Sequence, residues 1–442
     1  MSGLTFISRP IVSDASGLGL QGNLRVPGDK SISHRSVMLG AIANGVTEVS
    51  GFLQGEDNLA TVEAFRAMGA DIIQHSDTEL SISGVGLNGL HAPSKTLDLG
   101  NSGTSIRLLS GLMAGQQFDT VLTGDSSLQK RPMRRVTAPL AEMGAKIDTV
   151  DDGTPPLSIH GGASLQSIDY VMPVASAQVK SCLILAALYA KGISRITEPA
   201  PTRDHTERML AGFGFPLSRE GDTVVVDPAN VSLQGCKVDV PADISSAAFF
   251  LVAASIVPGS DLLLEHVGIN PTRIGVITIL KLMGANIEIL NEREVGGEPV
   301  AEIRVRAAKL KGIAIPEDQV PLAIDEFPAL FIAAACAEGK TVLTGAEELR
   351  VKESDRIQAM ADGLIALGVD ATPREDGIVI EGGQIGGGEV ESHGDHRIAM
   401  AFAVAGLVAQ SSIGINDCAN VNTSFPNFLG LSRQVGMDVK AD

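Results

Sequence analysis

Residues 281–287 read KLMGANI, and they carry a pattern from which the architecture follows. An apolar, helix-like segment ends at Gly284, and alternating, strand-like residues begin directly after it. A glycine in this position adopts the left-handed backbone conformation that ends helices, so the pattern predicts a helix end, a turn and a strand. Five other segments share the pattern: RAMGADI (66–72), AEMGAKI (141–147), AGFGFPL (211–217), IALGVDA (365–371) and RQVGMDV (433–439).

The glycines of these segments recur at intervals of 75, 70, 70, 84 and 68 residues, at Gly69, Gly144, Gly214, Gly284, Gly368 and Gly436. Periods of this length exceed those of ordinary solenoid repeats. We therefore expect six mixed α/β units, with three packed around each of two cores. The alternative is that helices ending in glycine are simply common in an α/β protein.

Composition and length bound the class of protein. A chain of 442 residues favours about two or three domains. Hydrophobic residues make up 44% of the chain but aromatic residues only 3%, so we expect an aliphatic interior. The formal net charge of −18 argues against binding to nucleic acid or to anionic membranes.

The sequence shows no evident signal for export or for insertion into a membrane. Its apolar runs are shorter than the about 20 residues that a membrane span needs, and its N-terminus lacks a basic and apolar leader. We expect a cytoplasmic protein. Cys182, Cys236, Cys336 and Cys418 are far apart, which predicts reduced and mostly buried thiols.

A domain junction is predicted near the middle of the chain. In VDVPADISSAAFFLVAASIVPG (238–259) a helix restarts after Pro241, with Asp243 or Ser245 as its N-cap. A second crossing is expected near residues 26–28. The first 25 or so residues could then complete the last unit of the far domain.

Helix starts in the first half carry polar and cationic residues. RVPGDKSISHRSVMLGAIANG (25–45) predicts a turn, a cap at Ser31 or Ser33, and a helix that begins with Lys30 and Arg35. Such a start is suited to an anion, although a capped surface helix would look the same.

Three further segments of the first half extend this pattern. LDLGNSGTSIRLLSGLMAG (97–115) and the basic KRPMRRV (130–136) suggest a partner with concentrated negative charge, or else a solvated loop. VASAQVKSCLILAALYAKG (174–192) offers Ser176, Gln178 and Lys180, which suit sugar hydroxyls and phosphate.

Acidic and basic residues gather before helices of the second half. Asp325 precedes FPALFIAAACAEG (327–339), and Glu353 lies among the cations of EELRVKESDRIQAMADGL (347–364). A carboxylate among cations is a candidate acid or base, although charged helix starts are often structural. HGDHRIAM (393–400) could be taken for a metal site, but no third ligand is evident and Arg397 would oppose a cation.

Seven segments, in order, give the chain a resemblance to the 5-enolpyruvylshikimate-3-phosphate synthase family: PGDKSISHR (27–35), LGNSGTSIR (99–107), KRPMRR (130–135), SAQVKS (176–181), TRDHTE (202–207), ELRVKESDR (348–356) and HGDHRIAM (393–400). The resemblance implies a two-domain inside-out α/β barrel of six βαβαββ repeats, three per domain. The domains would be residues 28–242, and residues 1–27 with 243–442, with the active site in the cleft between them.

The resemblance also implies a function. Such enzymes transfer the enolpyruvyl group of phosphoenolpyruvate to the 5-hydroxyl of shikimate 3-phosphate by addition and elimination, as a step of aromatic amino acid biosynthesis. They need no metal and no other cofactor. We expect a monomer that binds these two small molecules.

Site residues are implied by the same match of motifs. Residues implied for shikimate 3-phosphate are Lys30, Ser31, Arg35, Ser176, Ala177, Gln178, Arg203, Asp325 and Lys352. Residues implied for phosphoenolpyruvate are Lys30, Gly103, Arg131, Gln178, Lys352, Arg356 and Arg397. Those implied in catalysis are Asp325 as base, Glu353 or Lys352 as proton donor, and Lys30.

Three segments look like the class II branch of that family: SAQVKS (176–181), TRDHTE (202–207) and TSFP (423–426). The segment TSFP (423–426) lacks the Lys of class I enzymes, so one phosphate contact could be supplied differently. Gly103 occupies the position where glyphosate-tolerant class II members carry Ala. We therefore expect inhibition by glyphosate.

Two other functions are compatible with parts of the sequence. UDP-N-acetylglucosamine enolpyruvyl transferase shares the architecture, but it typically has a reactive Cys on a mobile loop, and no Cys here lies in a basic, Gly-rich loop. A non-catalytic protein that binds phosphorylated metabolites is the other alternative. The pairing of Asp325 and Glu353 with cations disfavours it.

Overall fold

The computed structural model describes residues 3–11, 19–150 and 153–442. Its chain forms two compact units. The first unit comprises Gly28–Val240 and Val295–Glu298, and the second comprises Met1–Pro27, Pro241–Glu294 and Pro299–Asp442. The chain thus enters the first unit after Pro27, leaves it after Val240 and returns to it for Val295–Glu298.

The first unit contains helices and three four-stranded sheets. Its helices are α1 (Lys30–Ile42), α2 (Glu56–Ala67), α3 (Gly103–Ala114), η1 (Leu128–Lys130), α4 (Arg134–Glu142), α5 (Ala177–Ala187), α6 (His205–Gly212) and η3 (Pro228–Asn230). Its strands are β3 (Asn44–Ser50), β4 (Asp71–Ser76), β5 (Glu79–Val85), β6 (Leu97–Asp98), β7 (Thr120–Thr123), β8 (Lys146–Val150), β9 (Thr154–His160), β10 (Asp169–Val171), β11 (Ser194–Thr197), β12 (Ser218–Glu220), β13 (Thr223–Val226) and β14 (Lys237–Asp239).

The sheet orders of the first unit are β14-β3-β5-β4, β6-β7-β9-β8 and β10-β11-β13-β12. In each sheet the first two strands are parallel and the others antiparallel, so β6-α3-β7-α4-β8-β9 and β10-α5-β11-α6-β12-β13 are βαβαββ repeats. The remaining repeat is permuted, because its first strand, β14, comes from the end of the unit. These repeats confirm the α/β fold class.

The second unit repeats this plan. Its helices are α7 (Ile244–Ile256), α8 (Gly275–Leu282), η4 (Glu317–Gln319), α9 (Phe327–Ala335), η5 (Glu347–Val351), α10 (Arg356–Ala366), α11 (His396–Ala405), η6 (Ala419–Thr423) and α12 (Phe428–Gln434). Its strands are β1 (Phe6–Ser8), β2 (Gln21–Leu24), β15 (Asp261–Gly268), β16 (Asn286–Val295), β17 (Glu298–Arg306), β18 (Lys340–Leu343), β19 (Asp370–Arg374), β20 (Gly377–Glu381), β21 (Gly388–Glu391), β22 (Ile413–Asn416) and β23 (Val439–Ala441).

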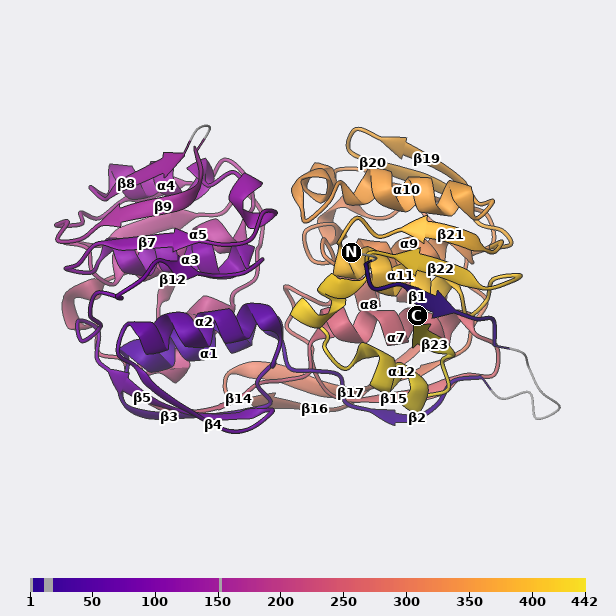
Figure 1. Ribbon diagram of the computed structural model, residues 1–442, viewed down its shortest axis with the longest axis horizontal. Helices are drawn as coiled ribbons and strands as arrows, with labels where there is room; N and C mark the ends of the chain where they lie inside the picture. Colours follow the sequence, from indigo (N-terminus) through magenta and orange to yellow (C-terminus); the bar gives the residue numbers. More distant parts are fainter. Residues whose placement is uncertain (1–2, 12–18, 151–152) are drawn as a thin grey trace. The chain divides into compact units, whose positions relative to one another are not determined.

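N-terminal strands complete two sheets of the second unit. The sheet orders are β16-β17-β15-β2, β18-β20-β19 and β21-β22-β1-β23. Phe6 of β1 pairs with Ile415 of β22 and Ala441 of β23, and Figure 1 shows the indigo β1 beside these two yellow strands. The expectation that the first 25 or so residues complete the last unit is confirmed for β1, whereas β2 pairs with β15 in a different sheet.

The six repeat glycines end helices, as the pattern predicts. Their φ angles are all positive, from 81° at Gly368 to 98° at Gly69. Because a side chain is strained in this conformation, glycine is the residue that allows each helix to turn directly into the following strand.

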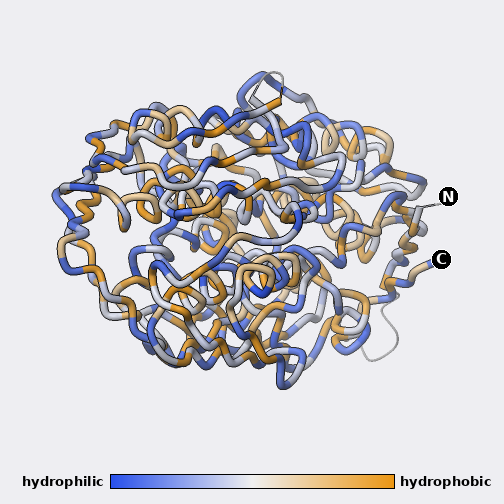
Figure 2. Tube along the Cα trace, turned by 60° about the vertical axis from the view of Figure 1, so that its left-hand side comes forward, coloured by the Kyte–Doolittle hydropathy of each residue, from blue (hydrophilic) through white to orange (hydrophobic). Residues whose placement is uncertain are grey.

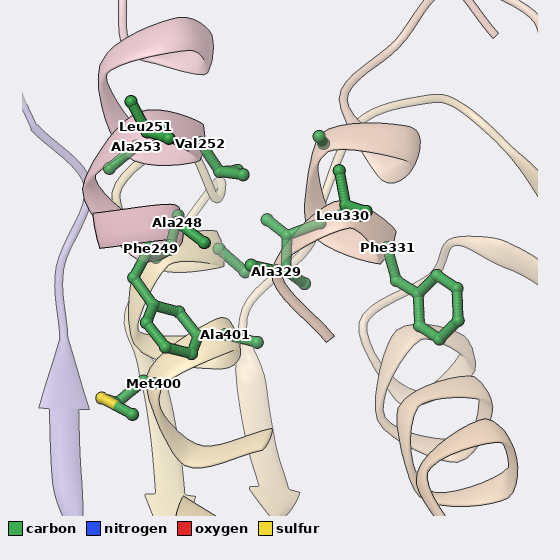
Figure 3. Close-up of a cluster of buried hydrophobic side chains, with 14 of the residues drawn as sticks. Ala248, Phe249, Leu251, Val252, Ala253, Ala329, Leu330, Phe331, Met400 and Ala401 are labelled. Carbon is green, nitrogen blue, oxygen red and sulfur yellow. The ribbon is translucent and has the colours of Figure 1, made fainter. Parts of the chain in front are cut away.

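The helices α7, α9 and α11 lie in the core of the second unit, which explains their apolar composition. In α7 every residue from Ile244 to Ser255 is buried, whereas β3 alternates exposed and buried residues. A helix that is apolar all round belongs in a core. Figure 3 shows Ala248, Ala329 and Ala401 where α7, α9 and α11 pack together.

Apolar and hydrophilic stretches alternate over short intervals along the chain (Figure 2). In the part of the chain that the structure describes, no helix is long and apolar enough to cross a membrane.

Candidate functional site

Arg356 is the centre of a charged cluster in the second unit. Its side chain is 1% exposed, and its Nε atom donates to Oδ2 of Asp395 at 2.8 Å. One terminal nitrogen lies 3.4 Å from Oδ1 of Asp325, and the other donates to Glu353 at 2.5 Å. Three carboxylates therefore surround one buried guanidinium.

Lys352 and Arg397 extend this cluster through Asp325. The Nζ atom of Lys352 lies 3.6 Å from Oδ1 of Asp325, and Arg397 donates to the carbonyl oxygen of Asp325 at 3.0 Å. Lys352, Glu353 and Arg397 are half-buried. The structure thus brings together all five sequence-predicted residues of the second half, which are Asp325, Lys352, Glu353, Arg356 and Arg397.

Helix caps set the positions of these residues. Asp355 caps α10 by accepting from the backbone N–H of Gln358 at 3.0 Å, and Asp395 caps α11 by accepting from that of Arg397 at 2.9 Å. Since capping fixes the first turn of each helix, it also fixes where Arg356 and Arg397 project.

The charges of the cluster stabilise one another. Burial alone would raise the pKa of Asp395, but Arg356 holds this pKa below its ordinary value. Burial alone would lower the pKa of Arg356, and the carboxylates of Asp395, Glu353 and Asp325 raise it instead. Both groups are therefore charged at neutral pH.

In the first unit, Lys30 begins α1 and pairs with the carboxylate of Asp57, at the start of α2. The cap of α1 is Asp29, whose carboxylate accepts from Ile32 N–H at 2.9 Å. The prediction of a Ser31 or Ser33 cap is therefore wrong, because the carboxylate one residue before the helix reaches its free amides first.

Arg35 is buried rather than open to the surface. Its guanidinium donates to the Ser31 carbonyl at 2.9 Å, to Ser181 at 2.8 Å and to Thr206 at 2.7 Å. Burial lowers the pKa of Arg35 to about 10, and the group stays charged at neutral pH. In this structure Arg35 braces the helix start that presents Lys30 and Ser31.

Gly103 lies between two guanidinium groups. A Cβ atom at this position would lie 2.9 Å from Nη1 of Arg131 and 3.1 Å from Nη1 of Arg107. Arg107 donates to Oε1 of Gln178 at 2.5 Å, and Arg131 donates to Asn101 at 2.6 Å. The segments that contain Gly103, Arg131 and Gln178 therefore meet.

Ser176 caps α5 and accepts from Val179 N–H at 3.4 Å. Ser176, Ala177 and Arg203 are half-buried. Lys180, one turn further along α5, is fully buried and pairs with Glu198 and Glu207. The expectation that Lys180 suits a phosphate is wrong, because its ammonium group is directed into the unit.

The four cysteines are free thiols, and Cys182 and Cys418 are buried. Burial raises the pKa of Cys336 and of Cys418 to about 12, and it raises those of Cys182 and Cys236 as well. Among the described residues, no group of three or more His, Cys, Asp and Glu could hold a metal ion.

Several residues of these clusters are not among the predicted site residues, although Arg107, Glu326 and Asp395 lie in the segments from which those were predicted. Asp57 and Arg107 contact selected residues, as does Asp395. A further buried group joins Glu326 to Ser245 and Arg273, with 3.6 Å between Arg273 and Glu326. Each of these residues contacts a partner that is distant in the sequence. Local spacing therefore could not predict that the two side chains meet.

Comparison with known proteins identifies the family. A family model described as EPSP synthase (3-phosphoshikimate 1-carboxyvinyltransferase) matches residues 16–431. The chain belongs to the EPSP synthase family. Among EPSP synthase relatives, the 3-phosphoshikimate 1-carboxyvinyltransferase of Methylococcus capsulatus is 68% identical over 421 residues, which are 95% of this chain and 96% of that protein.

Two other relatives agree. The 3-phosphoshikimate 1-carboxyvinyltransferase of Nitrosococcus oceani is 65% identical, over 96% of this chain and 96% of that protein. The solved structure of the EPSP synthase from Acinetobacter baumannii is 56% identical, with a TM-score of 0.89 over 99% of this chain and 100% of that chain.

Proposed function

We propose that this chain transfers the enolpyruvyl group of phosphoenolpyruvate to the 5-hydroxyl of shikimate 3-phosphate, giving 5-enolpyruvylshikimate 3-phosphate and phosphate. One observation carries the proposal: Asp325, a potential base, lies among Lys352, Arg356 and Arg397. In a chain 68% identical to a 3-phosphoshikimate 1-carboxyvinyltransferase, this arrangement fits a reaction between two anionic substrates.

The cations of the second unit would bind phosphoenolpyruvate. Arg356 and Arg397 are held by Asp395 and by the Asp325 carbonyl, so their guanidinium groups need little ordering when a carboxylate or phosphate arrives. Arg131 and Lys30 of the first unit, with Gly103 and Gln178, would complete this binding set.

The helix starts of the first unit would bind shikimate 3-phosphate. Ser176, Ala177 and Gln178 stand at the N-terminus of α5, where free amides and the helix dipole favour a phosphate. Arg203 and Lys30 would add positive charge, and Ser31 a hydroxyl. Arg35 is buried behind Ser31, so its contribution would be to hold Ser31 in place.

The chemistry needs one proton acceptor and one proton donor. Asp325 would accept the proton of the 5-hydroxyl as its oxygen attacks C2 of phosphoenolpyruvate, while Glu353 or Lys352 protonates C3. In the elimination, a proton of C3 returns to the group that protonated it, the bond from C2 to the phosphate oxygen breaks, and the re-formed double bond gives the enol ether of the product. Lys30, Lys352 and Arg356 would stabilise the charge of the intermediate.

Residues 28–242 would serve as one domain, and residues 1–27 with 243–442 as the other. Asp325 belongs to the second unit and the N-terminus of α5 to the first, so neither unit alone supplies both the base and the α5 anion site. We further propose that the enzyme acts as a monomer, that glyphosate inhibits it at Gly103, and that it works in the cytoplasm.

Phosphate release tests the function. The purified protein with phosphoenolpyruvate and shikimate 3-phosphate is expected to release phosphate, and to release none with UDP-N-acetylglucosamine as acceptor. Release with the nucleotide sugar alone would assign the chain to the rival transferase. Binding of both substrates without release would assign a non-catalytic protein.

A further inference from the structure

Lys180 and Glu198 form a buried ion pair in the first unit. Their side chains are each 0% exposed, and the Nζ atom of Lys180 lies 3.0 Å from Oε2 of Glu198. The same ammonium lies 2.7 Å from Oε1 of Glu207 and donates to the carbonyl oxygen of Thr202 at 3.4 Å. A charge this deeply buried is stable only when its partners surround it.

Glu198 is the second centre of this network, at the end of β11. Its Oε2 atom accepts from the backbone N–H of Thr202 at 3.0 Å and also from the Thr202 hydroxyl. Its Oε1 atom accepts from Arg219 at 2.7 Å. One carboxylate therefore closes the loop 198–202 on itself, while Lys180 holds the same loop from α5.

The composition of the loop makes these bonds important. Pro199 and Pro201 have no N–H groups, so they cannot anchor the loop through backbone donors. The first residue after them, Thr202, is held at its N–H, its hydroxyl and its carbonyl oxygen. Lys180 and Glu198 supply the partners of all three groups.

The next residue in the chain is Arg203, and the residues that follow it are anchored as well. Asp204 pairs with Arg208 at 2.8 Å at the start of α6. Thr206 donates to Ser181 of α5 at 2.8 Å. Arg203 therefore lies between two anchored neighbours, Thr202 and Asp204. It is half-buried, so part of it reaches solvent.

We propose that Lys180 and Glu198 are positioning residues, which set the orientation of the Arg203 loop against the N-terminus of α5 and thereby determine affinity for shikimate 3-phosphate. This inference rests on the proposed function, since Arg203 and Ser176–Gln178 are its proposed ligands. Ser176 and Gln178 lie on the same helix as Lys180, so the pair links the two parts of one phosphate site.

The variant Lys180→Met tests the proposal, because it removes the ammonium and keeps an unbranched apolar side chain. The Kd for shikimate 3-phosphate, measured by calorimetry without phosphoenolpyruvate, is expected to rise about tenfold or more. The KM for phosphoenolpyruvate at saturating shikimate 3-phosphate is expected to change by less than about threefold. A purely structural role would lower the melting temperature and leave both constants unchanged.

Controls keep the outcome interpretable. Asp261→Asn breaks an ion pair with Arg304 in the second unit and is expected to leave the Kd unchanged. If Lys180→Met does not fold, Thr202→Val removes only the hydroxyl donor to Glu198, and the Kd is expected to rise in the same direction. A folded Lys180→Met or Thr202→Val protein with the wild-type Kd overturns the proposal.

The wild-type protein separates this inference from the proposed function. If wild-type protein neither binds shikimate 3-phosphate nor releases phosphate, the proposed function is wrong. If it does both while Lys180→Met binds equally well, only the positioning role is wrong.

Discussion

The Nε atom of Arg356 lies 2.8 Å from Oδ2 of Asp395, and both side chains are buried at the starts of neighbouring helices in sequence, α10 and α11. Asp395 also accepts from the backbone N–H of Arg397. One carboxylate thus orients two of the proposed phosphoenolpyruvate ligands, and several consequences can be measured.

Asp395→Asn is expected to destabilise the fold by on the order of 3 kcal/mol, because it removes one charge of a buried pair. Glu353 and Asp325 still face Arg356, so the protein is expected to fold. The midpoint of urea unfolding measures the change. A midpoint equal to that of the wild type would contradict the structural importance of this pair.

The same pair predicts a pH dependence. Since the folded-state pKa of Asp395 is lowered, its stabilisation is present above the unfolded carboxyl pKa of about 4 and is lost as the pH falls through the folded-state value. The stability difference between wild type and Asp395→Asn is therefore expected to shrink below about pH 4. Urea unfolding at a series of pH values tests this, and a difference that grows in acid would refute it.

Asp325→Ala is expected to bind shikimate 3-phosphate with nearly wild-type affinity but to lose about 100-fold or more in kcat, because the proposed base is absent. Phosphate release gives kcat, and calorimetry gives the Kd. Glu348→Gln, which alters the other partner of Lys352, is the matched control and is expected to keep most of its turnover. Unchanged turnover in Asp325→Ala would exclude Asp325 as the base.

Gly103→Ala is expected to reduce inhibition by glyphosate by about tenfold or more, since the new methyl group would press on Arg131 and Arg107 in a packed site. The KM for phosphoenolpyruvate is expected to rise less than the inhibition constant does. Gly383→Ala is a control, because nothing lies within 4 Å of a Cβ atom there. Equal inhibition of wild type and Gly103→Ala would place glyphosate elsewhere.

The cysteines are expected to react slowly with iodoacetamide at pH 8 in the folded protein, because burial raises the pKa of all four thiols. Mass spectrometry measures the labelling, and activity is expected to persist. Rapid labelling of one cysteine with loss of activity would instead favour the rival transferase.

Local sequence patterns were sufficient for much of the architecture. The glycine at each repeat, such as Gly69 or Gly284, ends a helix because of its own backbone freedom, so its role is readable from neighbouring residues. Helix starts such as those of α5 and α11 are likewise local, since caps act over two or three residues.

Sequence order could not show that β14 supplies the first strand of a repeat that precedes it, or that the segment 311–315 runs beside β18 through isolated bridges. Pairing between distant strands depends on the register of a whole sheet. For the same reason the motifs predicted six repeats, but not that the first strand of the β3-β5-β4 sheet comes from the end of the first unit.

The sequence alone showed which segments carry the candidate cations and carboxylates, because motifs such as ELRVKESDR are contiguous. Burial separated residues of the same kind. Lys30 and Lys180 both lie in the first turns of helices, yet Lys30 is half-buried beside Asp57 while Lys180 is enclosed by Glu198 and Glu207. The direction of a side chain depends on which helices pack around it, and that packing involves residues far apart in the chain.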